Sequence, residues 1–461
     1  MSELPPAPAP AVYPTPGSVL AAAPRAPGRM DLRRALVLAG VVTLMALGGI
    51  GVVVYVGSKI GPVALAVGIG AAILPVPLLV LCFLWLDRYE PEPVKYLAFC
   101  FGWGAGVATA ASLAVNNGAA YLFPRMGLPD ELVGVLVAPF IEESMKALGP
   151  VLLFVFARRA FSGALDGIVY CGLSATGFAM VENILYLGGF GYARAAHQAG
   201  ALAGFGAVAV LFFVRIVMTG FAHPLFTAMT GIGLGVGART ADRWVRWCAP
   251  LAGLLVAMML HGTWNLMVTV ADTTDQPLVL LCGYIAVMVP IFLGMVGFTL
   301  WLRGGQGRLT ERVLGEYARA GWFSPPEVAT MGTVGRRLSA RRWARRTTGH
   351  HGATAMRAYQ FEATKLALLR DGIRRGLGTA PDEIHETLAE ERRLLDAIVA
   401  YRQVFTGRDP FAAPARWDGA HYQLILPDGS LRSLDPPEQP VVPVAVVLAP
   451  VRAPAYGYPY R

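Results

Sequence analysis

The chain contains a succession of apolar runs that are each long enough to cross a lipid bilayer. A transmembrane helix needs about 20 consecutive, predominantly apolar residues. Only 15% of the 461 residues are charged, whereas about 25% is usual for a soluble domain. We therefore expect an all-α, polytopic membrane protein. Its spans, about eight in number, are expected at residues 35–57, 62–86, 96–122, 132–157, 164–187, 206–236, 247–271 and 277–302.

Arginine and lysine residues gather in alternate loops between these runs. One set of loops carries Arg25, Arg29, Arg33, Arg34, Arg88, Lys95, Arg158, Arg159, Arg239, Arg243, Arg246, Arg303 and Arg308. The other set carries only Lys59, Arg125 and Arg194. Because loops rich in basic residues stay in the cytoplasm, we expect both termini to be cytoplasmic. The net charge of +9 then reflects topology and tails, and we expect no nucleic-acid partner.

Composition also divides the chain into four parts. Residues 1–30 are rich in proline and alanine and are expected to be disordered. Residues 31–303 hold the apolar runs and form the expected membrane domain. Residues 304–404 show helical spacing of apolar residues and are expected to form a cytoplasmic helical region. The proline-rich segment 405–461 is expected to be a disordered tail.

Two glutamates and a lysine interrupt the fourth apolar run. Glu142, Glu143 and Lys146 stand in the middle of it. A charge at the bilayer centre costs a few kcal/mol, so such residues usually face the interior of a bundle and serve a function. Lys146 follows Glu142 by four positions and Glu143 by three, and helical spacing lets it pair with either. An ion pair that joins two helices is the simplest structural explanation.

Polar residues also interrupt the three following spans. These are Glu182 and Asn183 in the fifth span, Arg215 and His223 in the sixth, and His261 and Asn265 in the seventh. Each of them alone is compatible with a hydrogen bond between helices. Together, two histidines and several carboxylates are the groups needed to bind a divalent metal ion or to activate water by acid–base chemistry.

The order of these motifs resembles that of the PrsW family of bacterial membrane proteases, distant relatives of the CAAX prenyl endopeptidases. The resemblance spans roughly residues 80–270. The motifs are EExxK (Glu142, Glu143, Lys146), FxxxEN (Phe178, Glu182, Asn183), an isolated His223, and HxxxN (His261, Asn265). Any one of these motifs is a weak signal, but four in order on successive spans are specific.

This resemblance implies an intramembrane endopeptidase of the bacterial plasma membrane that cleaves membrane-embedded proteins such as anti-sigma factors. Its partners are then the lipid bilayer and a membrane-protein substrate. The implied catalytic residues are Glu142, Glu143, Lys146, Glu182, Asn183, His223, His261 and Asn265. The implied cofactor is a divalent metal ion, zinc by ligand type, held by His223, His261 and Glu182.

In the implied mechanism one glutamate of the pair activates water, and Asn265 orients or polarises the scissile carbonyl. The sequence leaves open which glutamate is the base. A proton- or cation-coupled transporter is the main alternative, because buried carboxylates and histidines also line ion pathways. Against a transporter, the chain shows no internal repeat with broken helices.

Overall fold

The computed structural model describes residues 32–319, 322–381, 383–405, 415–417, 421–425 and 431–434. The chain forms two compact units. The membrane unit consists of Asp31–Gln306 with Gly372–Thr379, and the C-terminal unit holds Gly307–Asp371 and the residues from Ala380 onward. The expected domain boundary at residues 303 and 304 lies inside one continuous helix, which the two units share.

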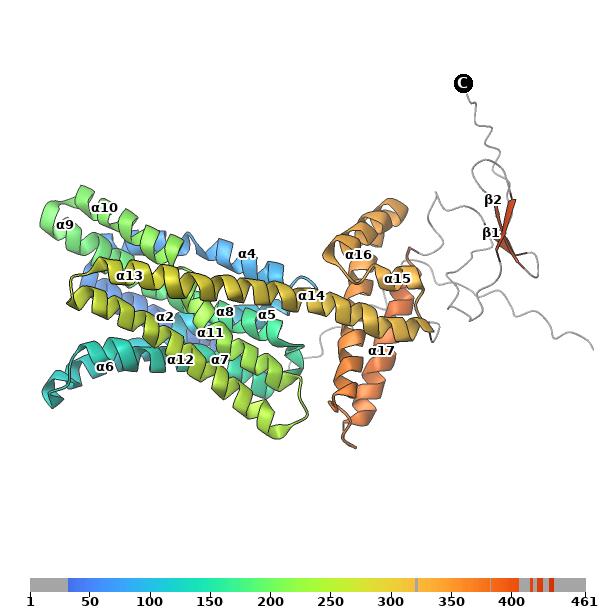
Figure 1. The fold of residues 1–461 in the computed structure, drawn as a ribbon, viewed down its shortest axis with the longest axis horizontal. Helices are drawn as coiled ribbons and strands as arrows, with labels where there is room; N and C mark the ends of the chain where they lie inside the picture. The colour runs from blue at the N-terminus through green and yellow to red at the C-terminus, as the bar shows by residue number, and fades with distance from the viewer. Residues whose placement is uncertain are drawn as a thin grey trace, which may run out of the picture. The chain divides into compact units, whose positions relative to one another are not determined.

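The described part of the membrane unit is helical throughout (Figure 1). Its α-helices are α2 (Leu32–Ile60), α3 (Pro62–Ile73), α4 (Val76–Leu86), α5 (Val94–Trp103), α6 (Thr109–Leu122), α7 (Ala138–Phe156), α8 (Ala164–Asn183), α9 (Arg194–Ala199), α10 (Ala201–Phe212), α11 (Ala222–Ala238), α12 (Arg243–Thr273), α13 (Pro277–Gly283) and α14 (Val289–Arg319). Short π-helical segments join or interrupt several of them: η1 (Gly104–Ala108), η3 (Val133–Val137), η5 (Ile184–Ala193), η6 (Phe213–Met218) and η7 (Tyr284–Met288).

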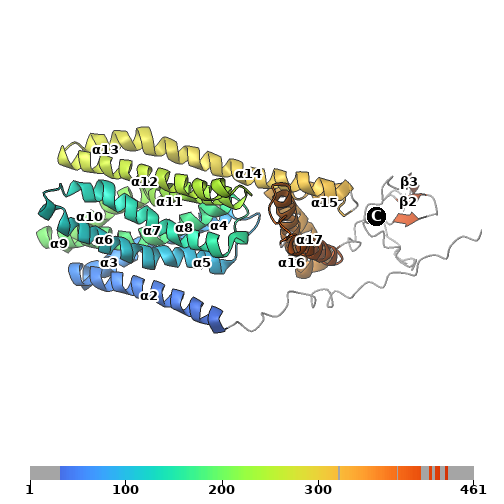
Figure 2. The same cartoon turned by 90° about the horizontal axis from the view of Figure 1, so that it is seen from below.

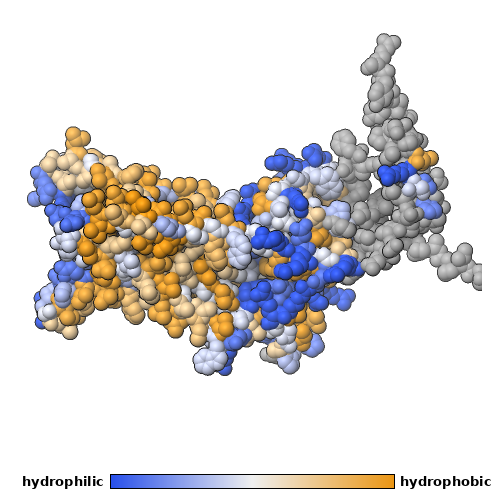
Figure 3. Space-filling model, viewed as in Figure 1, coloured by the Kyte–Doolittle hydropathy of each residue, from blue (hydrophilic) through white to orange (hydrophobic). Residues whose placement is uncertain are grey.

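Seven helical segments of the described chain are long and apolar enough to cross a membrane, one fewer than expected. They are Ala35–Ile60, Pro62–Leu86, Val94–Met126, Ala164–Ala199, Ala201–Ala238, Arg243–Thr273 and Pro277–Arg319. The missing span is the expected 132–157. The helix is present there as η3 and α7, but three charged residues lower its hydropathy. The polytopic membrane fold is confirmed, and the face of the membrane unit seen in Figure 3 is predominantly apolar.

Helix α8 is the centre of the bundle. Every residue from Leu165 to Ala179 is buried, and Figure 2 shows α7 and α8 between α2 on one side and α13 on the other. Glycines let α8 and α11 approach closely: a Cβ atom at Gly167 would lie 1.9 Å from the carbonyl oxygen of Gly231. Small residues commonly permit such close helix packing in membranes. This packing brings polar residues of α8 and α11 within reach of each other.

Helix α7 is held against its neighbours at the turn that carries its charges. Pro150 has no N–H and cannot donate to the Lys146 carbonyl, which lies four residues earlier. The Ser174 hydroxyl of α8 donates to that carbonyl instead, at 2.7 Å. The indole Nε1 of Trp103 donates to the Met145 carbonyl at 2.9 Å. These two bonds fix the height and rotation of α7 beside α5 and α8.

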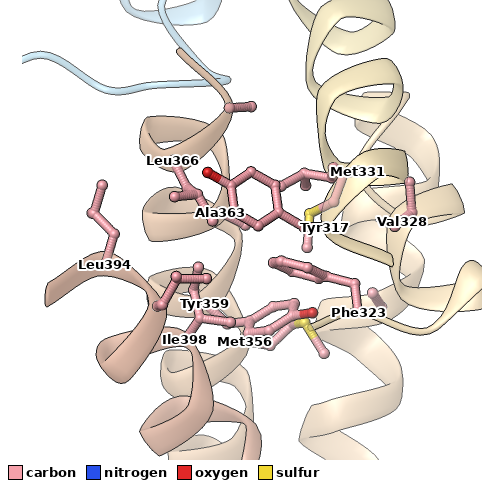
Figure 4. Packing of buried hydrophobic residues seen from close by; sticks show 14 of the residues in the cluster. Tyr317, Phe323, Val328, Met331, Met356, Tyr359, Ala363, Leu366, Leu394 and Ile398 are labelled. Atoms are coloured by element: carbon pink, nitrogen blue, oxygen red, sulfur yellow. The ribbon is translucent and has the colours of Figure 1, made fainter. Parts of the chain in front are cut away.

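The C-terminal unit has its own helices and core. Besides the end of α14 it contains α15 (Pro325–Ala329), α16 (Val334–Arg374) as far as Asp371, and α17 (Ile384–Arg402). Phe323, Met331 and Tyr359 are almost completely buried among these helices (Figure 4). Ser324 and Glu327 form a capping box at the start of α15, and Arg402 of α17 pairs with Glu327 at 2.7 Å. The helical C-terminal region is therefore observed.

A small antiparallel sheet stands where we expected only a disordered tail. Strands β1 (Ala415–Trp417), β2 (Tyr422–Ile425) and β3 (Leu431–Leu434) pair in the order β1-β2-β3. The expectation of disorder was wrong for these strands, because proline richness hid a hairpin signal: Asp428-Gly429 separates two short apolar runs. The expected tail 1–30 and, within the expected tail 405–461, residues 406–414, 418–420, 426–430 and 435–461 lie outside the described residues.

Candidate active site

A cavity of about 410 Å³ opens inside the membrane unit. The residues that line it belong to α2, α4, α6, η3, α7, α8, η5, η6, α11 and α12. Its polar wall includes Glu142, Glu182, Asn183, Arg215, His223, His261 and Asn265. Glu143 and Lys146 lie behind this wall and have no measurable exposure. All eight residues that the sequence singled out are thus at or next to one cavity.

The amine of Lys146 is the central contact of the group. Its Nζ lies 2.8 Å from Glu143 Oε1, 3.5 Å from Glu142 Oε2 and 3.0 Å from His223 Nδ1. It also lies 4.3 Å from the ring centre of Phe178. A buried ammonium is stable only when paired and hydrogen-bonded. Lys146 meets this need with groups from α7, α8 and α11, so the three helices share one ion pair network.

Glu143 uses both carboxylate oxygens in contacts within the protein. Its Oε1 accepts from Lys146 and from His261 Nδ1, the latter at 2.9 Å. Its Oε2 accepts from the Thr227 hydroxyl at 2.7 Å. This carboxylate is fully buried and is not part of the cavity wall. Glu143 is therefore placed to orient Lys146, Thr227 and His261.

Glu142 is the glutamate of the pair that faces the cavity. The amide Nδ2 of Asn116 donates to its Oε1 at a long 3.3 Å. Its Oε2 lies 3.5 Å from Lys146 Nζ and 3.8 Å from His261 Nε2. These contacts are longer than those of Glu143, and they leave room for a small molecule at the carboxylate.

The hydrogen bonds assign the tautomers of both histidines. Because Glu143 only accepts, His261 donates from Nδ1, and in the neutral imidazole the lone pair is then on Nε2, 3.8 Å from Glu142 Oε2. Lysine only donates, so His223 accepts from Lys146 at Nδ1. His223 Nε2 then carries the proton and donates to Glu182 Oε2 at 3.1 Å. His261 offers a free nitrogen, whereas both nitrogens of His223 are engaged.

Glu182 is held by an arginine that the sequence showed but that we did not place in the site. Arg215 NH2 donates to Glu182 Oε2 at 2.6 Å, and its Nε donates to Asn183 Oδ1 at 2.9 Å. The guanidinium lies 3.5 Å from the ring centre of Tyr186. An arginine inside an apolar run was itself the signal. Asn116 and Thr227 were also missed, since polar uncharged residues are common in membrane helices.

Asn265 lines the cavity, but its amide already has a partner. Its Nδ2 donates to the carbonyl of Gly134 at 2.7 Å. This bond joins α12 to the π-helical segment η3. The amide carries a second N–H, which can donate to a substrate carbonyl while the bond to Gly134 is kept.

One group of side chains has the composition of a metal site. Glu142, His223 and His261 each offer a ligand atom, and these atoms lie within 4.8 Å of one another. The expected ligands were His223, His261 and Glu182. The observed group has Glu142 in place of Glu182, whose carboxylate forms an ion pair with Arg215. Two imidazoles and one carboxylate suit a catalytic zinc ion with an open position. The donors fit, and His223 has to give up one present contact to become a ligand.

Comparison with known proteins points to one family. Residues 92–295 match the family model described as "PrsW family intramembrane metalloprotease". Protease PrsW of Bacillus subtilis (strain 168) is 29% identical over 204 residues, which is 44% of this chain and 82% of that protein. Protease PrsW of Geobacillus kaustophilus (strain HTA426) is 27% identical over 208 residues, 43% of this chain and 77% of that protein. No solved structure matches the chain.

Proposed function

The membrane unit belongs to the PrsW family of intramembrane metalloproteases, and we propose that this enzyme hydrolyses a peptide bond of a membrane-embedded protein in the cavity beside Glu142. The observation that carries the proposal is that the two adjacent glutamates have different surroundings. Glu143 is fully engaged inside the protein, while Glu142 faces the cavity together with the free Nε2 of His261.

Glu142 is proposed as the general base. A carboxylate in the cavity accepts the proton that an attacking water must lose. Lys146 lies close enough to compensate its charge before the reaction. Glu143 keeps His261 in the tautomer whose lone pair faces the same space. The nucleophile, its base and an imidazole then meet at one point, as hydrolysis requires.

The remaining residues of the set position His223 and Glu182 or polarise the substrate. Glu182 and Lys146 fix the ring of His223 from its two nitrogens. Asn183 and Arg215 hold Glu182 in place. Asn265 is proposed to keep its bond to the Gly134 carbonyl and to donate its second N–H to the scissile carbonyl, where it stabilises the developing oxyanion.

A divalent metal ion, zinc by the chemistry of the donors, is proposed as cofactor. Glu142, through one carboxylate oxygen, and His261 would hold it together with His223, which would first release Lys146 or Glu182. When bound, such an ion supplies a Lewis acid that polarises the carbonyl under attack.

The substrate class follows from the place of the cavity. It lies among helices that are long and apolar enough to span a bilayer, which supports a membrane-embedded protein as the substrate. The resemblance to the PrsW family suggests an anti-sigma factor as one such protein. From the distribution of basic residues among the loops we propose that both termini are cytoplasmic. The family resemblance supports a bacterial plasma membrane as the location.

Cleavage of a single-span reporter protein in proteoliposomes tests this function. The wild-type protein should cleave it, and Glu142→Gln should lose about 100-fold or more in rate, because Gln cannot accept a proton. Glu131→Gln, an exposed residue outside the cavity, is the matched control and should keep full activity. Full activity of Glu142→Gln, or proton-coupled uptake without cleavage, would overturn the proposal.

A further inference from the structure

Helix α6 contributes a polar stripe to the cavity that the proposed chemistry does not use. Thr109, Ser112 and Asn116 all line the cavity. They are spaced by three and four residues, so they lie along one face of the helix. The last of them contacts Glu142, the proposed base. The stripe therefore leads along the wall of the cavity to the reacting position.

Two polar atoms of this stripe have no protein partner. Ser112 is 2% exposed, and its hydroxyl has no hydrogen-bond partner among the described residues. The same holds for Asn116 Oδ1, although Asn116 Nδ2 donates to Glu142. A helical serine usually bonds back to a carbonyl of the preceding turn. Thr109 does this with Gly104 at 2.8 Å, but Ser112 does not.

These two atoms differ from the other polar groups of the cavity. Hydrogen-bond partners within the protein are present for Glu182, Asn183, Arg215, His223, His261 and Asn265. Buried polar groups are nearly always paired, and a bilayer offers no solvent to compensate for a missing partner. An unpaired hydroxyl and an unpaired amide oxygen, one helical turn apart beside the base, fit a ligand with matching polar groups.

We propose that Ser112 and Asn116 form a subsite that binds the main chain of the substrate next to the scissile bond. This inference rests on the proposed function and specifies what the cavity recognises. A membrane-spanning substrate must locally unwind before a peptide bond becomes accessible. Unwinding releases N–H and C=O groups that have no partner in the apolar layer.

The unpaired atoms of α6 suit these released groups. Asn116 Oδ1 accepts from a substrate N–H, and the Ser112 hydroxyl donates to a substrate carbonyl. The bond from Asn116 Nδ2 to Glu142 then links the bound main chain to the base. Because every residue has the same main-chain groups, this subsite selects an unwound segment and tolerates different side chains.

Binding to a cleavage-inactive protein tests the subsite separately from catalysis. The probe is a synthetic single-span peptide with a glycine pair near its middle, and the protein is the full chain carrying Glu142→Gln. Adding Ser112→Ala should weaken binding about 5- to 10-fold, the loss of one hydrogen bond. Thr230→Val is the matched control, since Thr230 is 1% exposed and also has an unpartnered hydroxyl but does not line the cavity.

Ester substitution in the peptide identifies the groups that are bound. Replacing single amides by esters removes one N–H at a time. At one position in the peptide, the ester should weaken binding to the protein that carries Glu142→Gln alone. The same ester should not weaken binding to the protein that also carries Asn116→Leu. Unchanged affinity of the Ser112→Ala variant, or an ester penalty that persists with Asn116→Leu, overturns the subsite. A wild-type chain that binds this peptide but never cleaves it overturns the proposed function instead.

Discussion

His261 Nδ1 lies 2.9 Å from Glu143 Oε1, and this contact joins α12 to α7 across the interior of the membrane unit. It determines which nitrogen of His261 faces the cavity. It also occupies the carboxylate of Glu143, so that Glu142 remains for chemistry. Together with the Thr227 hydroxyl on Oε2, this contact gives the two adjacent glutamates different roles.

Replacing either glutamate by glutamine should therefore have a different effect: loss of activity for Glu142 and loss of stability for Glu143. Glu142→Gln should abolish cleavage and leave thermal stability in detergent nearly unchanged. Glu143→Gln should destabilise the protein by about 3 kcal/mol, because it leaves the buried Lys146 without its closest countercharge. Thermal melts of both variants, with cleavage assays beside them, check this. The reverse order of stabilities would contradict the assignment of Glu143 as the positioning residue.

Arg215 should act through Glu182. Its fork binds Glu182 and Asn183 at once, which a lysine ammonium cannot reproduce. We expect both Arg215→Gln and Arg215→Lys to lower kcat about 10-fold or more, with little change in KM. In a Glu182→Gln background the same changes should have almost no further effect. Additive losses in this double-mutant cycle would show that Arg215 acts independently of Glu182.

Metal content provides a third test. The purified wild-type protein should carry a divalent ion, measured by elemental analysis, and a chelator should remove both ion and activity. His261→Ala should lower the metal content, since its Nε2 is the free donor of the group. His197→Ala, an exposed histidine outside the cavity, is the matched control. Equal metal content in the two variants would exclude His261 as a ligand.

A carboxyl cluster away from the cavity should make stability depend on pH. Asp87, Glu92 and Asp166 offer oxygens within 4.8 Å of one another, and the Tyr170 hydroxyl donates to Glu92. Asp87 and Glu92 belong to the loop between two spans. Burial raises the pKa of Asp87 from 3.8 to about 8, and burial with the nearby Asp166 charge raises the pKa of Glu92 from 4.5 to about 10.

The sign of the effect follows from these shifts. Both carboxyls hold a proton more tightly in the folded than in the unfolded chain, so their contribution is fully present below about pH 4. It is lost as the pH rises toward 8 for Asp87 and toward 10 for Glu92. Melting temperatures in detergent should therefore fall between pH 5 and pH 9, values chosen inside this window. The Asp87→Asn/Glu92→Gln variant should flatten the curve, and an unchanged slope would contradict the prediction.

The sequence by itself determined the membrane fold and the polar residues of the centre. Long apolar runs admit only helices in a bilayer, because every main-chain polar group must be paired within its own segment. Charges inside those runs are costly, so Glu142, Lys146 and His223 stood out from their surroundings. The Asp428-Gly429 hairpin signal was equally visible and was outweighed by proline content.

The tertiary structure decided which of these residues face one another. Helical spacing lets Lys146 reach either glutamate, and it contacts both; only Thr227 of α11 and His261 of α12 occupy Glu143 and leave Glu142 at the cavity. The pairing of Arg215 with Glu182 likewise joins residues 33 positions apart. Such contacts depend on the rotation and height of whole helices. Close packing between helices sets these, through small residues such as Gly167 and Gly231, and no local pattern along one helix encodes them.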